Sequence, residues 1–443
     1  MGISFAIPHH RVGFRRSGHR LPRRAQLGPV GPTFMSKNLQ KWAWSLLVIA
    51  VGTLLGIWMG RDLVSAGRTA PKSGAARPAR SVLPVDSPNP PGKSAPRADR
   101  RAGPSAEDLL LGVPNERVIR FKTEEAYRRF LARLEGSDLR LLGRLARFRA
   151  VRIGFEDLAD LEGLLGEDDD LQGNFLVAIP ELPAVAAQPG AVAFGASTLE
   201  WLGITGDNST WGEGVRIAIL DTGVVPHSAF PGGIREIDLI TQDEAIPYHG
   251  HGTAVASQIG GRHADTPGLA PGAELLSVRI AGSEGMSNSF LLAEGIVRAV
   301  DEGSHLINLS MGSYADSALV RDAVQYALDN QVVIVAAPGN EGLDRLAYPA
   351  ALDGVVAVGA VDAQGQILNF SNGGDSLDLS APGYELNAAW LEDEFIRASG
   401  TSFSTPVTVG AIAAILSEFG PIPVENALVL LRENLNAAGA PGD

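Results

Sequence analysis

Short apolar runs alternate with amphipathic segments through the second half of the chain. The runs are continuous and rich in β-branched residues, as buried parallel strands are. They lie at 215–220, 275–280, 306–309, 332–337 and 355–361. Segments with the apolar spacing of helices lie between them, at 253–259, 290–302 and 317–330. This alternation predicts a doubly wound, mostly parallel α/β sheet within residues 199–443.

A smaller unit is predicted over residues 113–180. Alternating runs predict strands at 117–121, 139–145, 148–153 and 175–179, and helical spacing occurs at 124–134 and 156–165. The order βαββαβ is that of a small α+β sandwich. A generic adaptor domain is the alternative interpretation, because fold alone does not define function. Residues 60–112 and 181–198 are rich in proline and alanine without an apolar period, so we expect a disordered linker and a second, shorter linker there.

The N-terminal end combines a basic stretch with an apolar one. Residues 1–41 contain eight Lys or Arg and no acid, and residues 42–59 contain no charged side chain. An uncharged segment of this length, with tryptophans at both ends, can span a membrane, and its basic flank stays in the cytoplasm. We therefore expect a transmembrane signal-anchor at 42–59 that places the rest of the chain in the periplasm or outside the cell. A secretory signal cleaved near Val64-Ser65-Ala66 is the alternative, and it exports the same body.

Composition and charge narrow the range of functions. The chain has no cysteine, which rules out a disulfide framework and a thiol nucleophile. Residues 1–105 carry 17 Lys and Arg against 3 Asp and Glu, whereas the rest carries 20 against 47. An acidic body argues against nucleic-acid binding by the folded part, and a basic N-terminus suits an anionic membrane face. No Gly-rich phosphate loop follows a predicted strand, which disfavours a nucleotide-binding α/β protein.

Asp221, His251 and Ser402 carry the side chains of a hydrolytic triad in one of its known chain orders. Asp221 comes directly after a predicted strand, at the edge of the sheet where α/β sites form. His251 opens a predicted helix, and a neutral imidazole can take a hydroxyl proton near physiological pH. The alternatives are an Asp-Gly turn for Asp221, a structural histidine, and a metal pair with His249. Two ligands without a nearby acid make that pair weak, so no metal site is predicted.

Ser402 is predicted at the N-terminus of a helix. The apolar face of that helix is formed by 409, 412, 413 and 416, and Pro406 is expected in its first turn, where no N–H is needed. Backbone N–H groups at such a terminus point at an oxyanion formed on an attacked carbonyl. Asn340 follows the 332–337 strand and offers a second donor. A simple helix cap at Ser402 and a Gly-rich turn at Asn340 are the alternatives.

Residues 199–435 are similar to the subtilase family of serine peptidases. The matching segments, in the order of the family, are 218–224, 251–256, 268–271, 307–312, 339–342, 381–383 and 400–406. The resemblance implies a serine endopeptidase that works through an acyl-enzyme intermediate. It implies Asp221, His251 and Ser402 as the triad and Asn340 as the oxyanion donor. A tethered pseudopeptidase that binds extended peptides without cutting them is the alternative function.

The same resemblance implies a set of substrate-binding residues. Ser310, Met311 and Gly312 would line the pocket for the residue before the scissile bond, and Gly285 and Met286 would form an extended edge that pairs with substrate backbone. A roomy apolar pocket is therefore expected beside Met311. The partners implied are protein or peptide substrates and the membrane, without nucleic acid. The sequence does not indicate an oligomeric state.

Some positions depart from the family pattern. Ala254 stands where a second histidine is usual, and Phe403 stands where a methionine commonly follows the nucleophile. These changes affect the shape of the pocket and leave the triad atoms intact. The stretch 260–267 is short where relatives often carry a calcium loop, so structural calcium is left open and no cofactor is expected to be required.

The 113–180 unit resembles the inhibitory prodomain of the same family in its position and order of elements. If it has that role, cleavage is expected between 179 and 199, in the predicted linker. Such a cut would release the catalytic domain from the membrane.

Overall fold

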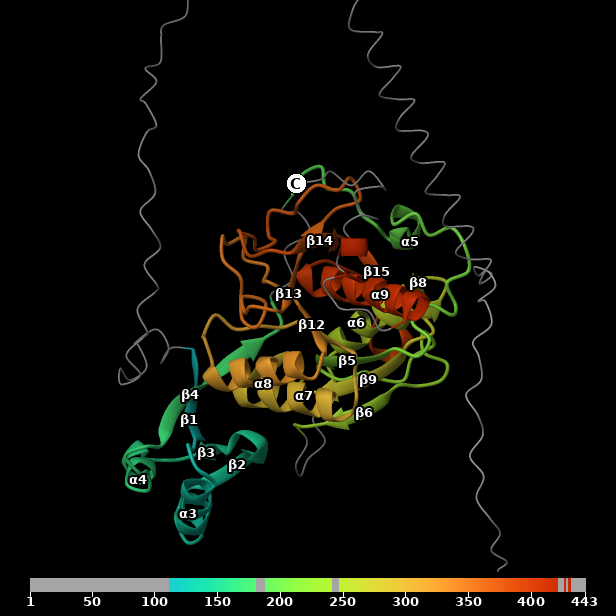
Figure 1. Cartoon of the computed structure of the whole chain (residues 1–443). Coiled ribbons are helices and arrows are strands. Elements are labelled where there is room, and N and C mark those ends of the chain that lie inside the picture. The colour runs from blue at the N-terminus through green and yellow to red at the C-terminus, as the bar shows by residue number, and fades with distance from the viewer. Residues whose placement is uncertain (1–110, 181–187, 241–246, 421–425, 428, 432–443) are drawn as a thin grey trace, which may run out of the picture. The chain divides into compact units, whose positions relative to one another are not determined.

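The computed structural model describes residues 111–180, 188–240, 247–420, 426–427 and 429–431 (Figure 1). The predicted cytoplasmic stretch 1–41 and the predicted signal-anchor 42–59 lie outside the described residues. So do residues 60–110 of the first predicted linker and 181–187 of the second.

Seven parallel strands form the main sheet of the described region, in the order β14-β13-β12-β11-β5-β9-β6. They are β5 (Arg216–Asp221), β6 (Arg235–Asp238), β9 (Glu274–Arg279), β11 (Leu306–Leu309), β12 (Val333–Ala336), β13 (Val356–Val361) and β14 (Leu379–Pro382). The predicted parallel α/β sheet is therefore confirmed. Asp221 is the last residue of β5 and does not follow the strand, so its side chain has a position fixed by the sheet itself.

Helices cover both faces of this sheet. They are α6 (His251–Gly260), α7 (Ser289–Asp301), α8 (Ala318–Asp329) and α9 (Thr401–Phe419). Alternate residues of β5 point to opposite faces: Ala218 and Leu220 pack in the cluster that includes α7 and α8, and Ile217 and Ile219 pack in the cluster that includes α6 and α9. Figure 1 shows these two helix pairs on opposite sides of the strands. Burial on both faces explains why the strands read as continuous apolar runs.

Short elements complete the region around the main sheet. They are the helix α5 (Thr198–Trp201), the hairpin of β7 (Arg262–His263) and β8 (Thr266–Pro267), and the hairpin of β15 (Leu386–Ala389) and β16 (Phe395–Ala398), with the 3-10 turn η3 (Leu391–Asp393) between its strands.

The helix α9 is apolar and largely buried. Among the described residues, it is the one helix long and apolar enough to cross a membrane, yet 61% of its most apolar window is buried inside the protein. Its residues pack with α6 and the main sheet, so α9 is a core helix. Pro406 is its sixth residue, one turn later than predicted. Proline has no N–H for the carbonyl of Ser402 four residues earlier, and the hydroxyl of Ser310 donates to that carbonyl at 2.8 Å instead.

Residues 112–178 form a smaller antiparallel sheet with two helices, in the order βαββαβ. The elements are β1 (Gly112–Arg120), α3 (Glu124–Leu134), β2 (Arg140–Leu145), the 3-10 turn η1 (Ala146–Phe148), β3 (Ala150–Gly154), α4 (Leu158–Glu162) and β4 (Asp170–Ala178). One face of the sheet packs on α3 and α4 through Ile119 and Ile153. The other face contributes Val118 and Ala150 to the cluster of α7 and α8. The sheet order is β10-β4-β1-β3-β2, so β10 (Met286–Asn288) extends the small sheet from the other region of the chain.

Candidate active site

Asp221 and His251 form a buried pair at the carboxyl edge of the main sheet. The imidazole Nδ1 lies 2.9 Å from Asp221 Oδ1 and 3.0 Å from Oδ2, and each residue is 1% exposed. Asp221 ends β5, an inner strand of the sheet, and His251 begins α6. Because a carboxylate can only accept, Nδ1 carries the proton, and Nε2 of the neutral ring is left as the basic nitrogen.

Glycines allow the end of the strand and the start of the helix to approach this closely. A Cβ on Gly252 would lie 2.3 Å from the carbonyl oxygen of Gly223 and 3.2 Å from Asp221 Oδ1. A Cβ on Gly250 would lie 2.3 Å from the ring of Trp390. A side chain at residue 252 would collide with the backbone that follows Asp221, and one at residue 250 would collide with Trp390.

Thr222 locks the same junction, and sequence reasoning gave it no role. Its backbone N–H donates to Asp221 Oδ1 at 2.7 Å. Its hydroxyl accepts from the N–H of Gly252 at 3.0 Å and donates to the carbonyl of His249 at 2.8 Å. The Asp-Thr-Gly sequence after an apolar run was the available signal, since a threonine beside the carboxylate can tie a strand end to a neighbouring helix.

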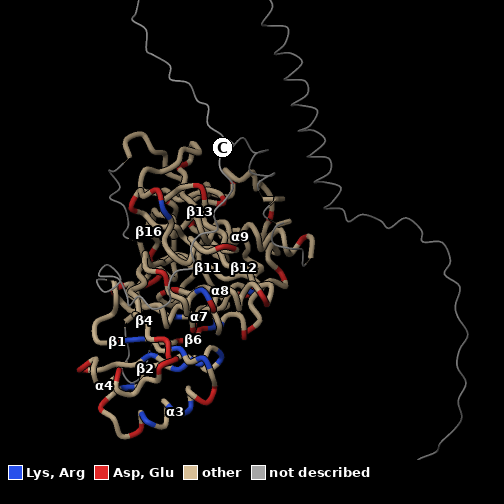
Figure 2. The backbone as a smooth tube through the Cα atoms, turned by 60° about the vertical axis from the view of Figure 1, so that its left-hand side comes forward, with Lys and Arg blue, Asp and Glu red and all other residues tan. Residues whose placement is uncertain are grey.

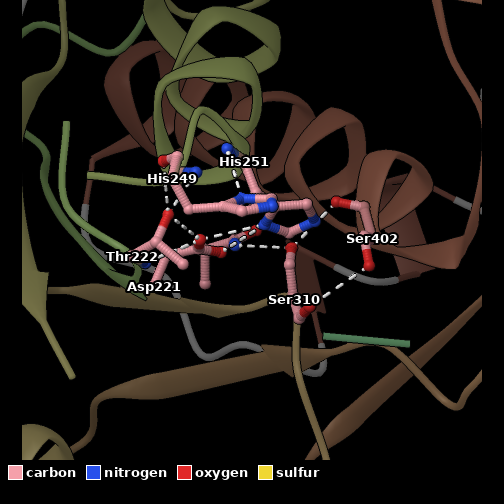
Figure 3. A network of polar contacts seen from close by, with 8 residues as sticks. Asp221, Thr222, His249, His251, Ser310 and Ser402 are labelled. Carbon is pink, nitrogen blue, oxygen red and sulfur yellow. Dashed lines mark hydrogen bonds and ion pairs between the residues drawn. The ribbon is translucent and has the colours of Figure 1, made fainter. Parts of the chain in front are cut away.

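Ser402 lies on the other side of the imidazole, as Figure 3 shows. It is the second residue of α9 and is fully buried. Its hydroxyl donates to the carbonyl of Ser310 at 3.1 Å. The buried Nε2 of His251 has no hydrogen-bond partner among the described residues. The structure therefore brings the three predicted triad residues into one place, with the serine hydroxyl turned toward Ser310.

Two aromatic contacts fix the orientation of the histidines. The ring of Phe403 lies 5.5 Å from the ring of His251, so the residue after Ser402 packs on the imidazole. His249 packs edge-on against Trp390 with a ring separation of 5.5 Å. The Nδ1 of His249 accepts the backbone N–H of His251 at 3.2 Å. Burial lowers the pKa of His249 below its usual value, and the nearby His251 lowers it further.

The two histidines of the alternative metal pair use their Nδ1 atoms within the protein. The Nδ1 atoms of His249 and His251 are both engaged in hydrogen bonds inside the protein. No group of three or more His, Asp or Glu side chains arranged to hold a metal ion is present among the residues described.

Asn340 lies beyond the end of β12 and contacts the start of α9. Its Oδ1 accepts from the backbone N–H and the hydroxyl of Thr401, both at 2.9 Å. With the oxygen fixed in this way, the orientation of the amide group is fixed, and Nδ2 lies on the side of Gly400. That glycine has a φ of 136°, and a Cβ on it would lie 3.0 Å from Nδ2. Gly400 is therefore required both by its backbone conformation and by the closeness of the amide.

A polar network holds the loop that carries Asn340. Asn372 Oδ1 accepts from the backbone N–H groups of Glu341 and Leu343 at 3.1 and 2.8 Å, and Asn372 Nδ2 donates to the carbonyl of Pro338 at 3.0 Å. Tyr314 donates to Glu341 in the same network. Burial and the Glu341 carboxylate raise the pKa of Tyr314 to about 12, so the phenol stays protonated as a donor.

The predicted substrate-binding residues lie around a strand of the chain itself. Ala178 of β4 pairs with Met286 of β10 on one side and with Gly312 on the other. Gly285 accepts from the N–H of the next residue, Ile179, at 3.1 Å. The backbone edges assigned to substrate therefore hold the end of the small unit.

Met311 and Ser310 occupy different surroundings from those expected. The side chain of Met311 is fully buried in the core cluster of α7 and α8 and lines no open surface. A continuous apolar core under β11 reaches as far as residue 311, which explains the difference from the predicted roomy pocket. Ser310 is also buried, and its hydroxyl and carbonyl both bond to Ser402.

Comparison with known proteins defines the class. A parallel α/β sheet with a buried Asp–His pair and a serine at a helix N-terminus is the arrangement of a serine hydrolase. The sequence model of the subtilase family (Peptidase_S8) matches residues 212–438, and the chain belongs to this family.

Similar proteins have been described in several bacteria. The thermostable alkaline protease of Halalkalibacterium halodurans is 35% identical over 213 residues, which are 47% of this chain and 58% of the relative. Subtilisin Savinase of Lederbergia lenta is 36% identical over 46% of this chain and 77% of the relative. The minor extracellular protease Epr of Bacillus subtilis is 33% identical over 53% of this chain and 35% of the relative.

A solved structure shares the fold over a larger part of the chain. Fervidolysin from Fervidobacterium pennivorans, a keratinolytic enzyme related to subtilisin, aligns with a TM-score of 0.61 and 20% identity. The alignment covers 73% of this chain and 57% of that one, more of this chain than residues 212–438 alone. At this identity the likeness shows the fold only.

Proposed function

We propose that this chain is a serine endopeptidase that cleaves peptide bonds through Asp221, His251 and Ser402. The buried pair of Asp221 and His251, with its basic Nε2 on the side of a serine at a helix N-terminus, is the observation that carries the proposal. Membership of the subtilase family supports protein or peptide substrates.

The chemistry follows from the positions of the donors and acceptors. Rotation of the Ser402 side chain away from the Ser310 carbonyl brings its hydroxyl to Nε2, which takes the proton as the oxygen attacks a peptide carbonyl. The Asp221 carboxylate stabilises the imidazolium and holds its tautomer. The imidazolium then protonates the leaving amine, and water hydrolyses the acyl-enzyme by the same steps.

Two donors are proposed to stabilise the oxyanion. One is the amide Nδ2 of Asn340, whose oxygen is held by Thr401. The other is the backbone N–H of Ser402 at the start of α9, since the N–H groups of Thr401, Phe403 and Ser404 already donate to Asn340 and Gly400. Loss of one such donor typically costs about 3–4 kcal/mol of transition-state stabilisation.

The test is covalent labelling with a fluorophosphonate probe, followed by mapping of the labelled residue. Ser402→Ala should abolish labelling and hydrolysis of casein. Ser404→Ala is the matched control, because Ser404 is a buried serine in the same helix that bonds to the Thr401 carbonyl at 3.0 Å. Unchanged hydrolysis in the Ser402→Ala variant would remove Ser402 from the mechanism. A folded protein that binds extended peptides but does not label would favour the pseudopeptidase.

We further propose that residues 113–180 are an inhibitory prodomain. The end of β4 lies between the two backbone edges assigned to substrate. Residues 111–180 carry 11 Lys and Arg beside 13 Asp and Glu, and Figure 2 shows positions of both charges on this unit. Arg120 pairs with Asp322 at 2.6 Å and Arg147 with Asp301 at 3.2 Å, which joins the unit to α8 and α7.

Processing and location form the last part of the proposal. N-terminal sequencing of the active protein should find a start within residues 179–199, and an intact chain with full activity would contradict the prodomain role. We propose that 42–59 anchors the chain with its catalytic region outside the cytoplasm. Membrane fractionation before and after processing tests the anchor, and sequencing near residue 66 tests the cleaved signal. Catalysis is expected to persist in EDTA, and an EDTA-induced fall in the thermal midpoint would indicate structural calcium.

A further inference from the structure

The end of β4 continues as a strand between two other backbone segments. Ala178 and Gly312 exchange both backbone hydrogen bonds, each 3.0 Å long. On its other side, Ala178 pairs with Met286, and the N–H of Ile179 donates to Gly285. We call residues 176–180 the strap. Its register is fixed by bonds on both sides, so the position of each residue along the site is defined.

Extended by two residues, the register of the Ala178–Gly312 pair sets residue 180 opposite Ser310. In an antiparallel pairing, residues that exchange both bonds recur every second position along each strand. The backbone bonds on this side end at the Ala178–Gly312 pair, and the next position of the same kind, by extension of the register, is 180 opposite 310. A residue at 180 would donate its N–H to the carbonyl of Ser310. Pro180, which is buried, has no N–H to donate.

The Ser310 carbonyl takes its hydrogen bond from the nucleophile instead. The hydroxyl of Ser402 donates to this oxygen at 3.1 Å. The basic Nε2 of His251 is left without a partner among the described residues. A buried carbonyl oxygen without a hydrogen bond costs free energy. Because residue 180 has no N–H for the Ser310 carbonyl, the Ser402 hydroxyl donates to that oxygen and is turned away from His251 Nε2.

We propose that Pro180 is a positioning residue that keeps the chain from cutting its own 180–181 bond. It acts through Ser310 on the direction of the Ser402 hydroxyl. The proposal rests on the endopeptidase function. It adds a reason why the strap can be bound in the site without being cleaved, whereas a substrate with an N–H at the same position is cleaved. Processing within residues 179–199 would then fall beyond the 180–181 bond.

The reaction that Pro180 prevents can be written in full. The Ser402 oxygen would bond to the carbonyl carbon of residue 180, and the bond to the nitrogen of Glu181 would break. The hydroxyl proton would pass through His251 Nε2 to that nitrogen, leaving an ester at residue 180 and a free amine on Glu181. Water would then hydrolyse the ester and restore the serine. No other reactant is needed.

The experiment compares full-length chains that differ at residue 180. Pro180→Ala and Pro180→Gly both restore the N–H with different side chains. Both should be cut between 180 and 181, giving a new N-terminus at Glu181, at least about tenfold faster than the parent chain. A factor of ten corresponds to one hydrogen bond that forms only when residue 180 carries an N–H. Pro114→Ala, at an exposed position of β1, is the matched control and should behave as the parent.

A second measurement separates positioning from loosening of the strap. If Pro180 only made the strap tighter, Pro180→Ala would raise hydrolysis of an added peptide without a cut at 180–181. The proposed role instead requires that specific cut, and requires it to disappear in the Pro180→Ala, Ser402→Ala double variant. A parent chain that is cut at 180–181 as fast as the variants would overturn the proposal.

The outcomes also distinguish this proposal from the proposed function. If all variants label with fluorophosphonate and hydrolyse an added peptide but none is cut at 180–181, the role of Pro180 is wrong and the endopeptidase stands. If no variant labels or hydrolyses any peptide, both proposals are wrong. Thermal unfolding of each variant confirms that the chain compared is folded.

Discussion

Replacement of Asp221 by asparagine tests the electrostatic core of the proposed mechanism. Asp221→Asn keeps the shape of the side chain and removes its charge. In the structure the carboxylate contacts Nδ1 of His251 at 2.9 and 3.0 Å and both residues are 1% exposed, so water does not screen the pair. The variant therefore loses the stabilisation of the imidazolium that forms when Ser402 gives up its proton.

The magnitude follows from the geometry. With the charges about 4 Å apart and an effective dielectric constant of about 20, the lost attraction is about 4 kcal/mol. This corresponds to roughly a thousandfold in rate. The amide NH₂ in place of Oδ2 would also favour the proton on Nε2, because Thr222 N–H keeps the oxygen at the Oδ1 position. The wrong tautomer brings the expected loss of kcat to about 10³–10⁴-fold.

The assay is the rate of hydrolysis of a fluorogenic peptide, together with the rate of fluorophosphonate labelling. Asp362→Asn is the matched control: Asp362 is 1% exposed and accepts backbone N–H groups of Val192, Gln364 and Gln366, each at 2.9 Å. It should lower the thermal midpoint while retaining labelling. A folded Asp221→Asn protein that loses less than about tenfold would refute the assignment of Asp221 as the partner of the base.

Three further predictions address the neighbouring groups. Asn340→Ala should lower kcat about 10²–10³-fold with little change in KM, because it removes a donor used only in the transition state; an equal change in KM would indicate a structural role. Gly400→Ala should lower both thermal midpoint and kcat, since φ of 136° and the 3.0 Å approach to Asn340 Nδ2 leave no place for a Cβ; Gly373→Ala, where a Cβ meets nothing within 4 Å, is its control. The folded-state pKa of His249 is lowered by burial and by His251, so the unfolded chain takes up a proton first, and stability present above about pH 6.5 falls below it. His249→Asn should shrink the drop in thermal midpoint between about pH 7 and pH 5; a drop as large as that of the parent chain would contradict this.

Local patterns in the sequence located most of the groups that the site brings together. Asp221 ends an apolar run and His251 starts a helix, and both features depend on a few neighbouring residues. Their contact follows once the strands are parallel, because the carboxyl ends of such strands lie at one edge. The predicted place of Pro406 is wrong by one turn. The helix begins directly after Gly400, whose φ of 136° breaks the helical path, and apolar spacing does not reveal that angle.

Features set by long-range register could not be predicted in the same way. The pairing of Ala178 with Gly312 joins residues 134 positions apart, and no short pattern encodes that choice of partner. The burial of Met311 depends on the packing of α7 and α8 under β11, which composition does not describe. The turn of the Ser402 hydroxyl toward Ser310 depends on what occupies the neighbouring edges. These are properties of the assembled chain.

In the proposed prodomain role, the covalent link between β4 and the rest of the protein affects how an outside peptide competes for the edges at Gly285 and Gly312. A tethered segment is present at an effective concentration on the order of millimolar, whatever the concentration of the protein. Dilution therefore cannot unblock an intact chain, and a free peptide has to exceed that local concentration or bind more tightly. Once the backbone is cut, the same contacts become bimolecular and weaken on dilution. Inhibition by the small unit is then independent of protein concentration before the cut and dependent on it afterwards.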